Sequence, residues 1–275
     1  MDLSTLIGLG AGLVVVIVVM IMDGGSPAEL FAHPSALILT IGGAMAAATI
    51  TVPLKTILSL PQLILGAIKG HKDSPAAAIE MLVKMADKAR REGLLALEDD
   101  SKKLHDPFLR RGVMLVVDGV DPAQVRAILE IDVQHMQERH AQGIGLLNAM
   151  GGFAPTMGII GTVMGLITVL KNLDDPGSLG KSIAGAFLAT LWGILTANII
   201  WLPLAGKLQH NSHEEAAYKH MLIEGILALQ AGENPRVLKE KLIGFLPPKA
   251  RGAAEAKGGA KAAGKPAGQP AGAEA

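Results

Sequence analysis

Hydroxyl and amide side chains stand among small residues in two strongly apolar segments of this 275-residue chain. Thr162 lies between glycines in the first segment, and Thr190, Thr196 and Asn198 lie in the second. Small residues recur there at every fourth position, at Gly185, Ala189, Gly193 and Ala197. A hydroxyl offers one donor and two acceptor lone pairs, so it can ligate a cation or hydrogen-bond a carboxylate. Rows of small residues are more typical of plain helix packing, however, and both interpretations stay open here.

Two prolines stand in the same segments, Pro155 in the first and Pro203 near the end of the second. A proline inside a helix removes one backbone hydrogen bond and crowds the preceding turn. We therefore predict a bend at Pro155. The plain alternative is that both prolines only shape helix ends.

The apolar segments lack the ionisable residue that ion-conducting membrane spans usually carry. No Asp, Glu, Lys or Arg occurs in any of the four uncharged runs described below. The one titratable candidate, His33, stands beside Pro34 at the edge of its run, where we expect a capping or interfacial role. A chain of this kind that handles ions must take the carboxylate from a partner.

The composition excludes several other classes of protein. Half of the residues are hydrophobic and 18% are charged, against about a quarter in an average soluble domain. The absence of cysteine excludes disulfides, thiol nucleophiles and cysteine-bound metals. Equal numbers of acidic and basic residues give no reason to expect nucleic acid as a partner. No phosphate-binding, zinc-protease or serine-hydrolase motif occurs, so we expect no catalytic residues, no metal site and no cofactor.

Four uncharged runs predict an all-α polytopic membrane protein with four transmembrane helices and a helical cytoplasmic domain. The first pair of helices falls within residues 1–54, at about 3–22 and 35–54, and the second pair within 141–206, at about 146–170 and 182–203. Each run is long enough to cross a hydrocarbon core of about 30 Å. A soluble four-helix bundle would need polar faces that these runs lack.

The basic residues predict the orientation in the membrane. Thirteen of the 25 lie between the second and third runs and ten follow the fourth, which leaves only Lys171 and Lys181 in the short loops on the other side. Because basic residues favour the cytoplasmic side, we expect both termini and the large central segment on the cytoplasmic side of the bacterial inner membrane.

The cytoplasmic part reads as helices with clear starts. Ser74-Pro75, Asp121-Pro122 and Asn234-Pro235 each combine a capping side chain with proline at the first helical position. These starts predict a helical domain at 55–140 and C-terminal helices at 207–248, with the helix from Pro122 running on into the third span. Residues 249–275 are a low-complexity run of Ala, Gly, Lys and Pro, which predicts a disordered tail.

Three sequence motifs resemble those of the flagellar stator proteins, the MotA type of the MotA/TolQ/ExbB proton channel family. The motifs are FAPTMGIIGTVMGL at 153–166 with KNLDDP at 171–176, AFLATLWG at 186–193 with WLPLAGKL at 201–208, and ARREGLLALE at 89–98. The resemblance covers the chain to about residue 248, with the same order of elements and the same four spans.

The resemblance implies a stator subunit that couples ion flow to rotation. Such chains form a pentameric ring around a dimer of MotB, a single-span partner whose transmembrane Asp carries the ion, and push on the rotor protein FliG. Matched residue by residue, the resemblance implies that Thr162 and Thr190 line the ion path. It implies that Pro155 and Pro203 are the two prolines tied to coupling. It also implies that Arg90 and Glu98 are the charged residues that contact the rotor. The alternative for the last two is a solvated helix face.

Two questions stay open on the sequence. A hydroxyl in the third span is compatible with sodium as well as with protons, and we favour protons. The alternative function is an energiser of the TolQ/ExbB type, which powers an outer-membrane process but typically has three spans. A self-sufficient transporter or an intramembrane enzyme would need an acid or base inside the membrane, and the four runs supply none.

Overall fold

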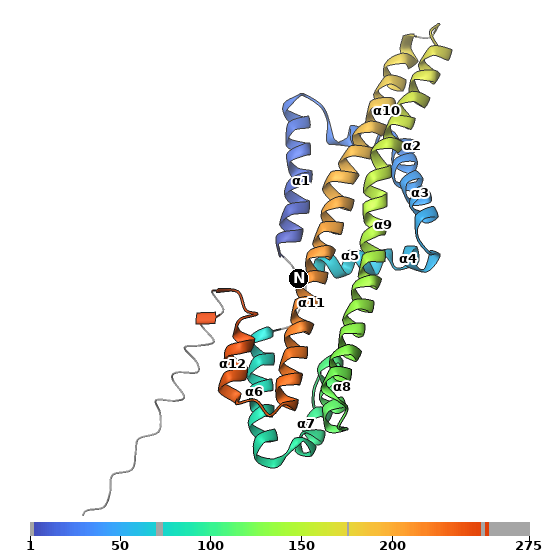
Figure 1. Cartoon of the computed structure of the whole chain (residues 1–275). Coiled ribbons are helices and arrows are strands. Elements are labelled where there is room, and N and C mark those ends of the chain that lie inside the picture. Colours follow the sequence, from blue (N-terminus) through green and yellow to red (C-terminus); the bar gives the residue numbers. More distant parts are fainter. Residues whose placement is uncertain (1–2, 70–73, 175, 249–250, 253–275) are drawn as a thin grey trace, which may run out of the picture. The chain divides into compact units, whose positions relative to one another are not determined.

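The computed structural model describes residues 3–69, 74–174, 176–248 and 251–252, and these residues form helices with no strand (Figure 1). Four helices are long and apolar enough to cross a membrane, within Leu3–Met22, Pro34–Thr51, Pro122–Lys171 and Leu179–Gln230. The all-α fold with four candidate spans is therefore confirmed. The chain divides into two compact units. We call residues 1–71 and 136–214 the span unit, and residues 72–135 and 215–275 the charged unit.

The first two spans belong to the span unit. Helix α1, Leu3–Met22, buries none of its residues within the chain, as expected for an apolar helix that lies in lipid. The second span consists of α2 (Pro34–Leu37), a π-helical turn at Ile38–Gly42 and α3 (Gly43–Thr51). It ends at Thr51 because Val52 is extended, the conformation favoured before a proline.

The third and fourth spans are parts of long helices that contribute to both units. Helix α9 runs unbroken for 50 residues from Pro122 to Lys171, which confirms the predicted continuous helix, and it passes through Pro155. The carboxylate of Asp121 caps its start by accepting a hydrogen bond from the Ala123 amide at 2.9 Å. The fourth span comprises α10 (Pro176–Leu195), a π-helical turn (Thr196–Trp201) and α11 (Leu202–Gln230).

Small and medium apolar side chains make the core of the span unit. Ala44 and Ala48 of α3 are fully buried, as are Leu147 and Met150 of α9 and Ala197 of the second π turn. Two short helices, α4 (Leu54–Leu58) and α5 (Leu60–Lys69), follow the second span. Alanines let the helices approach closely, and larger side chains such as Leu146 and Trp201 fill the rest of this core.

The charged unit begins with four helical segments, and the predicted capped start at Ser74 is confirmed. The four segments are α6 (Pro75–Glu92), a 3-10 turn at Leu94–Leu97, α7 (Glu98–Lys102) and α8 (Pro107–Val117). Ser74 accepts from the Ala77 amide and Asp106 from the Phe108 amide. Gly93 ends α6 with a φ of 86°, a backbone conformation that other residues rarely adopt.

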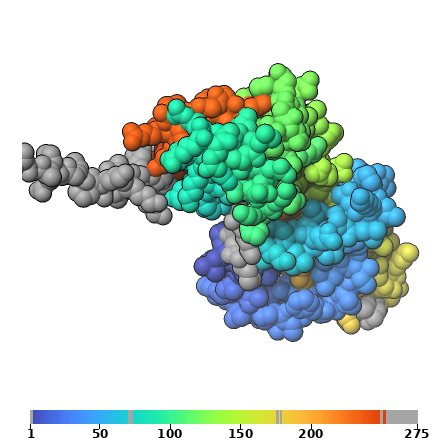
Figure 2. Space-filling model, turned by 90° about the horizontal axis from the view of Figure 1, so that it is seen from below, coloured from blue at the N-terminus to red at the C-terminus, as the bar shows by residue number. Residues whose placement is uncertain are grey.

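The last helix of the charged unit, α12 (Pro235–Ile243), packs against α6. Figure 2 shows α6, in teal, beside α12, in orange. Asn234 caps the start of α12 through the Arg236 amide, as predicted. The core between the elements of this unit contains the fully buried side chains Leu82, Leu109, Leu129, Ile226 and Leu242.

A network of ion pairs joins three helices of the charged unit. Glu224 of α11 accepts from Arg126 of α9 at 2.7 Å and from Lys241 of α12 at 3.1 Å. Burial raises the pKa of Glu224, but the hydrogen bonds from the two cations outweigh it, so the pKa lies below its ordinary value. The carboxylate is therefore charged at neutral pH and holds α9, α11 and α12 together.

Two sequence-based predictions concern boundaries that the structure leaves untested. The compact units divide at His71, His135 and Glu214, whereas the predicted domains follow the expected membrane borders. The predicted disordered tail, 249–275, lies outside the described residues apart from Arg251 and Gly252.

Candidate functional site

Helices α9 and α10 approach each other backbone to backbone, because glycines face the partner helix. A Cβ atom on Gly158 would lie 2.8 Å from the carbonyl oxygen of Ala189, and one on Gly193 would lie 2.6 Å from that of Ala154. Real Cβ atoms essentially never come this close to backbone. The predicted row of small residues therefore does pack helices, and the close packing also decides which polar groups meet.

The hydroxyls of Thr162 and Thr190 meet between these helices. They form a hydrogen bond with each other, in which either oxygen can be the donor. The Thr162 hydroxyl also lies 3.2 Å from the carbonyl oxygen of Gly158 and 3.1 Å from that of Ala186. The Thr190 hydroxyl lies 3.3 Å from the same Gly158 oxygen. Both threonine residues are half-buried.

This arrangement gathers four oxygen atoms but only two hydroxyl protons. One proton lies in the bond between the threonines, and the other is directed at a backbone carbonyl. The lone pairs that these bonds leave unused belong chiefly to the two hydroxyls, because each carbonyl also accepts from its own helix backbone, and they favour a cation or the O–H of a protonated carboxylic acid. To donate to a carboxylate instead, a hydroxyl must give up one of its present acceptors. The pair can therefore respond to protonation of an acid placed beside it.

The other polar residues predicted in the fourth span do not join this pair. The Thr196 hydroxyl donates to the Trp192 carbonyl at 2.8 Å, and the Asn198 amide donates to the Ile194 carbonyl at 2.9 Å. Both bonds stay within their own helix. Of the hydroxyls singled out in the sequence, the structure brings together only the two that the family resemblance placed in the ion path.

The two prolines lie in different helical contexts. Pro155 sits inside α9, where its missing amide leaves the Gly151 carbonyl without its usual donor. The bend expected there stays a prediction. Pro203 follows the π-helical turn Thr196–Trp201, and Leu202 donates to the carbonyl of Ala197, five residues earlier. Such wider turns occur frequently at functional sites, and no pattern in the sequence predicts this one.

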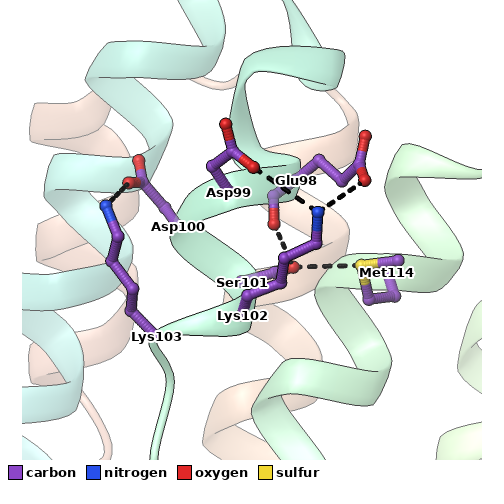
Figure 3. Close-up of polar contacts among 7 residues, drawn as sticks. All are labelled: Glu98, Asp99, Asp100, Ser101, Lys102, Lys103 and Met114. Carbon is purple, nitrogen blue, oxygen red and sulfur yellow. Dashed lines mark hydrogen bonds and ion pairs between the residues drawn. The ribbon is translucent and has the colours of Figure 1, made fainter.

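Arg90 and Glu98 lie on the surface of the charged unit, on either side of the Gly93 turn. Arg90 is exposed, and it has no ion-pair partner in the part of the chain that the structure describes. Glu98 opens α7 and pairs with Lys102 at 2.9 Å (Figure 3). This hydrogen bond raises the pKa of Lys102. The two residues are thus available to a partner, although Glu98 is already paired.

The same surface contains further charged groups that sequence reasoning missed. Lys88 of α6 donates to Asp100 of α7 at 2.7 Å, which raises the pKa of Lys88 and lowers that of Asp100. Asp100 also lies 3.7 Å from Lys103 (Figure 3). The Ser101 hydroxyl, fully buried beneath them, donates to the Glu98 carbonyl at 2.6 Å. Twelve residues separate Lys88 from Asp100, so no helical spacing announces their contact.

Comparison with known proteins identifies the family. Residues 100–221 match the MotA/TolQ/ExbB proton channel family. Motility protein A of Treponema pallidum is 39% identical over 251 residues, which cover 91% of this chain and 96% of that protein. The structure of C. jejuni MotAB has a TM-score of 0.86 at 31% identity, and that of the Bacillus subtilis flagellar MotAB stator complex has 0.84 at 36%. Each of the two matches covers 90% of this chain and 97% of the chain in the solved structure. The chain belongs to the MotA/TolQ/ExbB proton channel family, and within it to the motility protein A group.

Proposed function

We propose that this chain is a stator subunit of the bacterial flagellar motor, which forms an ion channel with a MotB-like partner and converts ion flow into torque on the rotor. The relatives named motility protein A and the two MotAB structures support this function. The paired hydroxyls of Thr162 and Thr190, in spans that contain no charged residue, are the observation that carries the mechanism.

The ion path runs past this hydroxyl pair, and the partner supplies the acid. A carboxylate from a single-span partner, placed beside Thr162 and Thr190, alternates between its charged and protonated forms as ions pass. A free lone pair of one hydroxyl accepts a hydrogen bond from the protonated acid, and a rotated hydroxyl donates to the carboxylate. The hydroxyls thus stabilise both forms without adding a charge to the membrane interior.

The transported ion in this proposal is the proton. Support comes from the description of the family as a proton channel family. An oxygen cluster of this kind also suits sodium, so the ion has to be decided by a measurement on the assembled motor. The chain itself is proposed to carry no catalytic residue, metal site or cofactor.

Several copies of the chain form a ring around the partner in the cytoplasmic membrane, and a pentamer is the proposed stoichiometry. The exposed apolar residues of α1 and α9 provide surface for lipid and for neighbouring copies. The distribution of basic residues supports both termini on the cytoplasmic side. The charged unit then faces the rotor, where Arg90 and Glu98 are proposed to meet FliG.

A substitution at Thr190 tests the ion path. Thr190→Val keeps the shape of the side chain but removes its hydroxyl, so proton flux through vesicles containing the complex with its partner should fall about tenfold, the effect of about 1.4 kcal/mol on a barrier. Thr49→Val is the matched control, because the Thr49 hydroxyl is exposed and bonds only within α3. Equal flux in wild type and Thr190→Val would remove the pair from the path.

A further inference from the structure

A cavity of about 430 Å³ lies in the span unit between α2, α9 and α10. Figure 1 shows α2 beside the two long helices. Small residues of α9 and α10 form its floor, namely Gly161, Gly165, Ala186 and Ala189. Its volume falls in the range of sites that hold small amphiphilic molecules.

The wall formed by α2 is fixed in place by contacts with α10. The ring of His33 packs against Gly185, where a Cβ atom would lie 2.9 Å from the imidazole Nδ1. The indole of Trp192 donates to the Leu30 carbonyl at 2.9 Å, and its ring lies 5.7 Å from that of Phe31. The cavity is therefore held open by the fold and does not depend on a mobile loop.

One end of the cavity is polar and positively charged. His33, Ser35, Thr168, Lys181 and Ser182 line this end. No carboxylate is among the described residues that line the cavity, and Lys181 has no ion-pair partner among them. The other end is apolar, with Leu39, Met164 and Ala189. A ligand that matches both ends has an anionic head and a hydrocarbon tail.

The length of the cavity fits one leaflet of a bilayer. Eight residues of α10 separate Lys181 from Ala189, which corresponds to about 12 Å along the helix. A hydrocarbon core is about 30 Å thick, so this distance is close to half of it. Lys181 lies five residues from the start of α10, near the end of the span. The polar end therefore lies at headgroup depth and the apolar end near the middle of the membrane.

We infer that this cavity binds an anionic phospholipid, with the phosphate at Lys181 and His33 and one acyl chain along the glycine and alanine floor. Amines and hydroxyls together match a phosphate by charge and by hydrogen bonding. The floor residues Gly161 and Ala189 directly precede Thr162 and Thr190 in the sequence.

The inference is tested with the complete complex, chain and partner, in vesicles of phosphatidylethanolamine that contain a minor share of phosphatidylglycerol. The probe is phosphatidylglycerol with a photoreactive diazirine in its acyl chain. The readout is a ratio of labelling yields. Its numerator is the labelling of Met164 and Leu39, which line the cavity, and its denominator is the labelling of the exposed Val14 and Val15 of α1, which reports lipid contact in general.

We expect Lys181→Gln to lower this ratio about fivefold, the effect of one cation near an anionic headgroup. Lys171→Gln, in the same short loop but outside the cavity, should leave the ratio unchanged. Ser182→Phe, which fills the polar end, should lower it independently of charge, and a phosphatidylcholine probe should label the cavity less.

Equal ratios in wild type and in both cavity variants would overturn the inference. An unlabelled cavity in the wild type would also do so, because it would mean that another copy of the chain covers the site. The readout is lipid contact in the purified complex, so its failure is distinct from a failure of the proposed motor function, which is read from ion flux.

Discussion

The proposed ion path contains two hydroxyl groups, of Thr162 and Thr190, and two backbone carbonyls beside them. Thr162 and Thr190 contribute no net charge, so they can line an ion path without the desolvation cost of a buried ion. Their hydrogen-bond pattern leaves acceptor positions free and can change when a neighbouring acid changes its protonation. This requires that the acid belong to another chain, because no residue of the four spans is acidic.

At the residue scale we predict that Glu98→Lys impairs swimming while the amount of stator in the membrane stays normal. The exposed pair of Glu98 with Lys102 contributes little to stability, about 1 kcal/mol or less, so the fold should tolerate its loss. The charge reversal acts on the contact with the rotor. Swimming speed and membrane levels are measured together.

Lys102→Gln is the control for this substitution, because it breaks the same ion pair and keeps Glu98. We expect this variant to swim nearly as well as wild type. Normal swimming of Glu98→Lys would contradict the assignment of Glu98 to the rotor contact.

At the scale of the elements, close approach of α9 and α10 creates the hydroxyl pair. Gly158 and Gly193 leave room for the opposite backbone, and Gly165 faces Ala186 in the same way. Without this approach each threonine would bond only within its own helix, as Thr196 does. The close helix packing is thus what brings together the two hydroxyls of the proposed ion path.

Gly193→Ala tests this dependence. The added methyl group would lie 2.6 Å from the Ala154 carbonyl oxygen, so the helices must separate, at a cost of about 1 to 3 kcal/mol. We expect a lower thermal midpoint of the purified complex and a loss of proton flux. Gly152→Ala is the matched change on α9, because nothing lies within 4 Å of its added methyl group. Wild-type flux in Gly193→Ala would show that the close approach is not needed.

At the scale of the whole molecule, an apolar span unit and a charged unit share the helices α9 and α11. The first unit contains the proposed ion path, and the second contains the proposed rotor contact. Continuous helices common to both give the proposed conversion of ion flow into torque a direct covalent route. In this proposal each unit also needs a partner, the MotB-like acid for the first and FliG for the second.

The coupling ion is a property of the assembled motor. We predict that cells that depend on this stator swim in sodium-free medium and stop when a protonophore collapses the proton gradient. Swimming speed under the two conditions decides between the ions. An unrelated sodium-driven process is the control for residual sodium. Arrest in sodium-free medium alone would identify a sodium motor.

The sequence by itself determined the four spans, the helix starts and the need for a partner acid. These features follow from local rules, since uncharged runs partition into lipid and a capping side chain before proline starts a helix wherever it stands. The pairing of Ser74, Asp121 and Asn234 with their helix starts required no knowledge of the fold.

Only the tertiary structure decided which groups meet. Twenty-eight residues separate Thr162 from Thr190, and 162 separate Trp192 from Leu30, so their contacts depend on how the helices pack and not on any spacing. The same holds for the π-helical turn before Pro203 and for the cavity beside Lys181. A sequence pattern states the face on which a side chain lies, but the distance between two faces is set by the glycines and alanines of both helices together.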